Sequence, residues 1–196
     1  MWPDEAIYLP WGVWLLSWFV AAFWANRTVN APGFAQQVRY RVFEIGGFFL
    51  LLFYAGRPGP NGVPATRFMP LWTLPMDARW AMVALAAAGF AFCWWARIHL
   101  GRLWSGTVTR KEDHHVVDTG PYAIVRHPIY TGILIAALAT VLERGTVPTL
   151  AGFALLIVAF VMKGRVEENF LRAELGAEAY DAYARKTAML VPFVKL

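Results

Sequence analysis

The residues best suited to binding or catalysis lie in one stretch, from His114 to Gly132. This stretch contains three of the four histidines of the chain and the pair Arg126-His127, which is followed directly by Pro128. Proline in the first turn of a helix costs no hydrogen bond, so Pro128 predicts a helix start. The positive end of that helix would face Arg126 and His127, an arrangement that favours a bound carboxylate or phosphate.

A second group suited to binding or catalysis is the carboxylate pair Glu167-Glu168 in the C-terminal part of the chain. If this part folds back onto the first stretch, it offers negative charge opposite the helix start. A ligand that carries both a carboxylate and a cationic centre would then be bound from both sides. S-adenosylmethionine is such a ligand, and methyl transfer from its sulfonium requires alignment and exclusion of water but no metal. Many other ligands are zwitterionic, so these residues alone leave the choice open.

Several of these residues have simpler interpretations. His114 and His115 could be solvated, Tyr122 and Tyr130 could be aromatic residues of a membrane interface, and Arg126 could reflect the basic bias of cytoplasmic segments. A di-metal site is another use for three histidines. No Asp or Glu stands at ligand spacing beside them, however, and we predict no metal site.

Composition indicates the environment of the chain. Hydrophobic residues make up 58% of it and charged residues 16%, against about 25% charged in an average soluble domain. The apolar residues form long runs, which argues against a soluble helical bundle. We count five candidate membrane spans of roughly bilayer length, at 7–25, 40–56, 80–98, 128–142 and 147–162. The first run has no basic residues before it and no small-residue cleavage site after it, so we expect a retained helix and no signal peptide.

Features within and between these runs predict further details. Glu44 lies in the second run, where it could face a partner or a cavity; we favour a headgroup position beside Arg41. Segment 57–75 is rich in proline and glycine and predicts a surface loop, and Cys93 is expected to be a packing residue. Residues 165–186 repeat apolar positions at helical spacing and predict an amphipathic helix interrupted at Gly176.

The basic residues predict the orientation of the chain in the membrane. With the N-terminus outside, fourteen of the eighteen Lys and Arg residues lie inside; the other four are Arg57, Arg67, Arg79 and Arg144. The segment before Pro128 and the C-terminal tail then share the cytoplasmic side and can meet. The expected fold is an all-α polytopic membrane protein, a single domain over 1–196 with variable N-terminal spans (1–79) and a cofactor-binding half (80–196).

Two ordered motifs carry a family resemblance. The first is His-x-x-Val-x-x-Gly-Pro-Tyr-x-x-x-Arg-His-Pro-x-Tyr-x-Gly, from His114 to Gly132. The second is Glu-Glu-x-x-Leu-x-x-x-x-Gly-x-x-x-Tyr-x-x-Tyr, from Glu167 to Tyr183, with Pro192-Phe193 close behind. Together they resemble the isoprenylcysteine carboxyl methyltransferase family, and related phospholipid methyltransferases share this half. The resemblance covers roughly residues 95–193.

The resemblance implies an integral membrane methyltransferase that uses S-adenosylmethionine. It implies that the cofactor is held by the segment before the helix, by the helix start and by a tail carboxylate, which aligns with Glu167. The implied cofactor-binding residues are His114, His115, Val116, Val117, Tyr122, His127, Pro128, Ile129, Tyr130, Glu167 and Glu168. The implied catalytic residues are Arg126, His127 and Glu167. A substrate-side arginine of the family falls near Lys163 or Arg165, and a lysine there would provide a point charge where a bidentate fork is usual.

The function that follows is methyl transfer to a lipophilic acceptor that enters from the bilayer. A carboxylate acceptor of the prenylcysteine kind needs no general base, whereas a lipid amine must lose a proton, for which His127 or Glu167 are candidates. One alternative is an NADPH-dependent membrane reductase of the sterol-reductase type, although those enzymes carry an acidic residue where this chain has Ile133. Another is a non-catalytic scaffold or transporter. We expect the bilayer as a partner and no nucleic acid, and the oligomeric state stays open.

Overall fold

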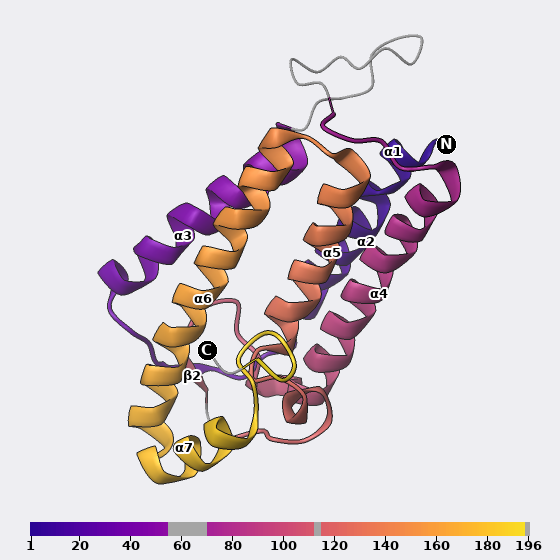
Figure 1. The fold of residues 1–196 in the computed structure, drawn as a ribbon. Helices are drawn as coiled ribbons and strands as arrows, with labels where there is room; N and C mark the ends of the chain where they lie inside the picture. The colour runs from indigo at the N-terminus through magenta and orange to yellow at the C-terminus, as the bar shows by residue number, and fades with distance from the viewer. Residues whose placement is uncertain (55–69, 112–114, 195–196) are drawn as a thin grey trace.

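The computed structural model describes residues 1–54, 70–111 and 115–194. Within these ranges the chain is mostly helical, and Figure 1 shows the helices side by side. The α-helices are α1 (Pro3–Ala6), α2 (Tyr8–Ala21), α3 (Phe34–Phe48), α4 (Met76–Leu100), α5 (Pro128–Arg144), α6 (Val147–Leu175) and α7 (Ala177–Lys186). A π-helical turn η1 (Phe49–Phe53) extends α3. The segment between α4 and α5, residues 101–127, is called the connector, and it contains the 3-10 turns η3 (Gly101–Leu103) and η4 (Gly120–Ala123). His114 and most of the predicted loop 57–75 lie outside the described residues.

Small residues bring the helices into close contact. A Cβ atom built on Gly89 of α4 would lie 2.6 Å from the carbonyl oxygen of Gly132 in α5. Likewise, a Cβ atom on Gly152 of α6 would lie 2.7 Å from the carbonyl oxygen of Gly47 in α3. Such contacts let backbones approach where lipid offers no hydrophobic drive for helix association. Cys93 is buried in the contact between α4 and α5, as predicted.

Two helical segments are long and apolar enough to cross a bilayer, Met76–Leu103 and Val147–Leu175. Large apolar side chains also face outward: Phe19 and Phe23, at and just beyond the end of α2, are 72% and 84% exposed. Apolar patches on this scale are unusual on soluble monomers, and in a membrane protein they contact lipid. The chain is therefore a membrane protein. Of the five expected spans, the runs 80–98 and 147–162 lie within these two segments.

Helix α6 differs from its prediction. The sequence predicted a span at 147–162 and a separate amphipathic helix from residue 165, whereas the structure has one helix over 29 residues. No proline or capping residue separates the two parts, so the backbone continues through Gly164. A Cβ atom there would lie 2.5 Å from the Met189 side chain and 3.1 Å from the His127 ring. Glycine is thus placed for close packing and not for a break, whereas Gly176, with φ 99°, does end the helix as predicted.

The end of α2 is fixed by a buried arginine. Arg97 of α4 is fully buried, and its guanidinium donates to the carbonyl oxygens of Ala21 (2.7 Å), Trp24 (2.8 Å) and Gly101. The guanidinium carbon also lies 4.6 Å from the ring centroid of Trp104. The last carbonyl groups of a helix need hydrogen-bond donors, and the Arg97 guanidinium is the donor for Ala21. Helix α2 therefore ends at Ala21, four residues before residue 25, where the predicted span ends. The same contact holds Trp104 in place.

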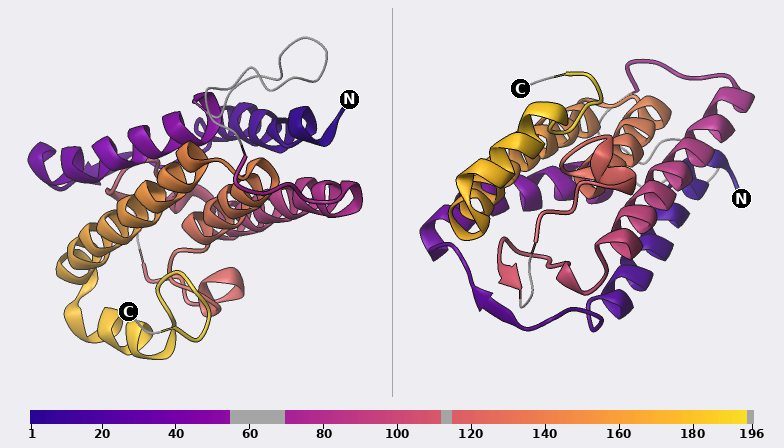
Figure 2. Two further views of the ribbon diagram at one scale, coloured as in Figure 1. Left: turned by 45° about the horizontal axis from the view of Figure 1, so that its top comes forward. Right: turned by 90° about the horizontal axis from the view of Figure 1, so that it is seen from below.

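The connector and the C-terminal segment meet at one end of the bundle. Figures 1 and 2 show α7 beside the connector, far from the N-terminus. The strands β1 (Thr28–Asn30) and β2 (Arg110–Lys111) pair antiparallel at this end and join the α2–α3 link to the connector. An isolated parallel bridge pairs Val125 with Ala188. The predicted meeting of the two segments is confirmed.

Candidate functional site

The start of α5 is held in place by backbone hydrogen bonds from the C-terminal segment. The amide of Arg126 donates to the carbonyl of Ala188 (2.8 Å), and the amide of His127 donates to the carbonyl of Met189 (3.1 Å). His127 is the N-cap residue, and Pro128 opens the helix as the sequence predicted. The position of both functional side chains therefore depends on residues about sixty positions later in the chain.

Glu168 binds the two cationic or potentially cationic side chains at this helix start. It accepts hydrogen bonds from Arg126 Nε (2.7 Å) and Arg126 Nη2 (3.2 Å), and one of its oxygens lies 2.9 Å from His127 Nε2. Arg126 Nη1 donates to the carbonyls of Ala184 and Thr187. The guanidinium is thus committed to the protein. It is not free for an incoming carboxylate, which is the use that the sequence suggested for it.

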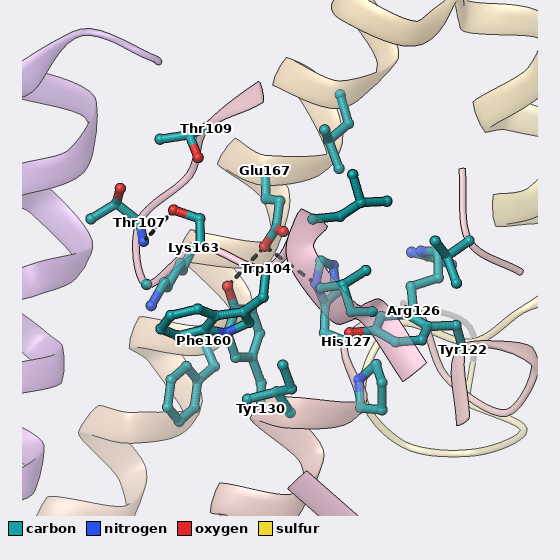
Figure 3. Close-up of a pocket in the computed structure, with 18 of the residues that line it drawn as sticks. Trp104, Thr107, Thr109, Tyr122, Arg126, His127, Tyr130, Phe160, Lys163 and Glu167 are labelled. Carbon is teal, nitrogen blue, oxygen red and sulfur yellow. Dashed lines mark hydrogen bonds and ion pairs between the residues drawn. The ribbon is translucent and has the colours of Figure 1, made fainter. Parts of the chain in front are cut away.

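Glu167 points into the cavity, on the other side of the His127 ring. Its carboxylate accepts a hydrogen bond from the Tyr130 hydroxyl (2.8 Å) and lies 3.6 Å from His127 Nδ1. The Tyr130 ring is stacked between the rings of His127 (centroids 5.2 Å apart) and Phe160 (4.9 Å). Figure 3 shows Glu167 above this stack. This carboxylate keeps lone pairs free for a ligand.

A second charged pair lies farther along the cavity. Lys163 Nζ is 3.2 Å from Glu44 Oε1 and 5.1 Å from the centroid of the Tyr130 ring. The expectation that Glu44 pairs with Arg41 is wrong, because Arg41 donates to Gln37 (3.2 Å) and Glu44 reaches across to α6. Lys163 lines the cavity, while Arg165 is exposed and does not. Of the two substrate-side candidates, the structure brings only Lys163 to the site.

These side chains surround one cavity of about 220 Å³. Its wall includes most of the residues singled out from the sequence: His115, Val116, Val117, Tyr122, Arg126, His127, Pro128, Ile129, Tyr130, Lys163 and Glu167. Glu168 is not in the wall and acts through Arg126 and His127. Among the described residues, no group of three His, Cys, Asp or Glu side chains could hold a metal ion.

The connector wall is closed by α7. The Tyr183 hydroxyl donates to the carbonyl oxygen of Tyr122 (2.8 Å). Burial raises the pKa of Tyr122 well above its usual value, and burial likewise raises the pKa of Tyr183. Both phenols therefore stay neutral near neutral pH, and Tyr183 remains a hydrogen-bond donor to the connector.

Sequence reasoning missed part of the wall. The missed residues are mainly aromatic or small polar ones from α2, α3, α6 and the connector: Trp14, Trp18, Glu44, Phe48, Trp104, Thr107, Thr109 and Phe160. One signal could have found Phe160, because it belongs to the stripe Phe160, Lys163, Glu167, Leu171 and Leu175, spaced three or four residues apart on one face of α6. Glu44 had a signal of its own, because a carboxylate within an apolar run could face a partner or a cavity. The aromatic residues from α2 and α3 have no such signal, since only tertiary packing brings them here.

Part of the chain is similar to known proteins. Residues 82–173 match the model of the isoprenylcysteine carboxyl methyltransferase (ICMT) family. A probable protein-S-isoprenylcysteine O-methyltransferase of Oryza sativa subsp. indica is 32% identical over 115 residues, 58% of this chain and 54% of that protein. The protein-S-isoprenylcysteine O-methyltransferase of Schizosaccharomyces pombe is 30% identical over 101 residues, 50% of this chain and 43% of that protein.

A relative with a different name matches as well. The cobalt-zinc-cadmium resistance protein CzcN of Cupriavidus metallidurans is 31% identical over 126 residues, 61% of this chain and 55% of that protein. The chain thus spans about half the length of the relatives it matches. The matched segment contains α5, most of α4 and α6, and the connector that lines the cavity. Over residues 82–173 the chain is similar to the isoprenylcysteine carboxyl methyltransferase family.

Proposed function

We propose that the protein is a membrane methyltransferase that transfers the methyl group of S-adenosylmethionine to a lipophilic acceptor. The observation that carries the proposal is the cavity, in which Glu167 and the ring of His127 lie 3.6 Å apart and face the connector wall. Bound there, S-adenosylmethionine would supply an electrophilic methyl group on a sulfonium. Glu167 provides negative charge for a cationic ligand group, and the backbone of 115–117 and the buried Tyr122 provide the remaining wall.

The chain's own residues set the geometry for direct displacement. Stacking of Tyr130 between His127 and Phe160 fixes the cavity floor. The aromatic residues Trp14, Trp18 and Trp104 line the apolar part of the cavity and exclude water. Alignment in a dry site is what a displacement at carbon requires. The same aromatic wall suits a lipid-like acceptor that enters from the bilayer. Relatives named for prenylcysteine methylation support a prenylcysteine-like carboxylate, and a lipid amine is the other acceptor class.

We place the N-terminus outside and the cofactor site and C-terminus in the cytoplasm, with α1–α2, α3, α4, α5 and α6 as five membrane-crossing segments. The basic bias of the connector and tail supports this orientation. The residues 80–196 would form the cofactor half of a single domain, and 1–79 the more variable spans.

Ligand titration of the purified protein tests the proposed cofactor. S-adenosylhomocysteine should bind, and Glu167→Ala and His127→Ala should each weaken it by about tenfold or more, since each removes a polar group from the cavity wall. Glu178→Ala on the exposed side of α7 is the control and should bind normally. Tight binding of NADPH without binding of S-adenosylhomocysteine would instead favour a reductase. Normal binding by both cavity variants would contradict the assigned site.

A further inference from the structure

Both cations that line the cavity among the described residues are already paired with carboxylates. Arg126 is bound by Glu168 (2.7 Å), and Lys163 is bound by Glu44 (3.2 Å). Glu167 adds another carboxylate whose nearest partners are a hydroxyl and an imidazole. The described part of the site therefore presents no uncompensated Lys or Arg to an anionic acceptor, and a second carboxylate placed beside Glu44 and Glu167 would be repelled.

Glu44 comes from a different part of the chain than the rest of the charged wall. It lies on α3, outside the matched residues 82–173, and reaches Lys163 across the contact between α3 and α6. A carboxylate within a membrane helix is costly and is usually retained for a function. Its side chain is 22% exposed and lines the cavity, so it can contact a bound molecule as well as Lys163.

The charged groups divide the cavity into two parts. Figure 3 shows Lys163 on one side and Tyr122 and Arg126 on the other, with Glu167, Tyr130 and Trp104 between them. The side of Tyr122, up to Glu167 in the middle, is the part assigned above to the methyl donor. The acceptor would then occupy the side of Lys163, next to Glu44.

We propose that Glu44 makes this enzyme specific for a neutral, proton-bearing acceptor, a lipophilic alcohol or amine, in place of a carboxylate. The inference rests on the proposed methyltransferase function and adds the acceptor class. In the reaction the acceptor oxygen or nitrogen bonds to the methyl carbon, the sulfonium S–C bond breaks and its electron pair stays on sulfur. The O–H or N–H proton of the acceptor passes to the Glu44 carboxylate, while Lys163 holds that carboxylate in position.

A matched set of acceptors tests the proposal in lipid nanodiscs. The set is S-farnesyl-N-acetylcysteine and its two analogues in which CH2OH or CH2NH2 replaces the carboxylate, so only the reacting group differs. Two readouts are measured: transfer of labelled methyl from S-adenosylmethionine, and acceptor affinity by quenching of tryptophan fluorescence, because Trp14, Trp18 and Trp104 line the cavity. The wild type should prefer the alcohol or the amine by about tenfold or more in both readouts.

Substitutions at the ion pair separate acceptor choice from helix packing. Glu44→Gln should lower transfer to the alcohol and amine by about tenfold or more and raise affinity for the carboxylate, because Lys163 is then unpaired. Glu44→Asp keeps the charge and should keep the preference. The control is Glu143→Gln, which breaks the interhelical pair with Arg79 (2.6 Å) outside the cavity. It should lower thermal stability and leave the acceptor preference unchanged.

The outcomes distinguish this inference from the function on which it rests. If S-adenosylhomocysteine binds but the wild type prefers the carboxylate in transfer and affinity, the inference is wrong and the methyltransferase stands. The same holds if Glu44→Gln loses stability without changing the preference, since the pair then only joins α3 to α6. If Glu44→Gln does not fold, the wild-type preference and Glu44→Asp decide. If neither S-adenosylhomocysteine nor any acceptor binds, the proposed function itself fails.

Discussion

The two neighbouring carboxylates of α6 serve different partners. Successive residues of a helix are rotated by about 100°, so Glu167 faces the cavity while Glu168 faces the start of α5. Glu167 contacts Tyr130, a cavity residue, whereas Glu168 accepts from Arg126 and His127. Of these two adjacent carboxylates, one therefore lines the cavity and the other supports the start of α5.

This separation predicts different effects for two conservative substitutions. Glu168→Gln removes the charge that binds Arg126 and should lower the free energy of unfolding by about 2 kcal/mol. For a chain of this size, this loss corresponds to a decrease of roughly 4–8 °C in the midpoint temperature of thermal unfolding. Glu167→Gln should weaken S-adenosylhomocysteine binding by about tenfold with little change in midpoint. Thermal unfolding and calorimetric titration measure the two effects. Equal loss of stability in both variants would show that Glu167 also supports the fold.

At the residue scale, the sequence predicted the part of the site that lies in local motifs. His127, Tyr130 and Glu167 stand in ordered patterns with identifiable chemistry, and the structure brings them into one cavity. Glu44 and Trp104 could not be assigned, because their roles come from contacts with Lys163 and Arg97 that join distant elements. Such contacts leave no periodic or motif signal in a single sequence.

At the scale of elements, the contact between α4 and α5 depends on two glycines. Gly89 and Gly132 face each other, and a Cβ atom on either would lie within 2.6 Å of the other's carbonyl oxygen. Backbone atoms cannot move aside as a flexible side chain can, so any larger residue must separate the helices. Because α5 carries His127 at its start, separation would also shift the site.

Gly89→Ala is therefore expected to lower the free energy of unfolding by about 1–3 kcal/mol through overpacking. Gly12→Ala is the matched control: Gly12 lies in α2, and a Cβ atom there would meet nothing within 4 Å. That variant should be more stable by about 0.5–1 kcal/mol, because alanine favours the helix. Thermal unfolding of both variants measures whether Gly89→Ala loses stability and Gly12→Ala gains it. A stable Gly89→Ala protein would mean that the two helices separate at little cost.

Helices were easier to predict than their ends. Each apolar run in the sequence corresponds to helix in the described residues, because apolar length and composition are local properties. The end of α2 at Ala21 depends on the guanidinium of Arg97, and the continuity of α6 through Gly164 depends on packing against Met189. Both are decided by partners far away in the chain, so helical periodicity alone placed these boundaries wrongly.

At the scale of the whole molecule, the family-matched half and the N-terminal half form one structure. Helix α3 packs along α6, and α1 and α2 pack on α4. The Trp11 indole of α2 donates to Thr140 of α5 (3.0 Å), and Asn30 donates to Glu174 (2.8 Å). The N-terminal helices are therefore part of the cavity wall and of the fold.

The orientation of this structure in the membrane is checked with single cysteines. Glu5→Cys in α1 and Glu178→Cys in α7 lie at exposed positions, and the native Cys93 is buried. A membrane-impermeant maleimide added to intact cells should label Glu5→Cys alone. Glu178→Cys should react only after permeabilisation, because the basic segments stay in the cytoplasm. The opposite pattern would place the cofactor site outside.

The hydrogen bonds from Arg126 and His127 to Ala188 and Met189 have a consequence for biosynthesis. A nascent chain translated as far as Leu175 already contains every apolar segment that must leave the translocon. It still lacks the segment that fixes the start of α5, so the proposed cofactor site is incomplete. The ribosome must add α7 and the residues after it before the cavity wall is complete, so on the proposed function a chain that stalls at Leu175 binds no cofactor.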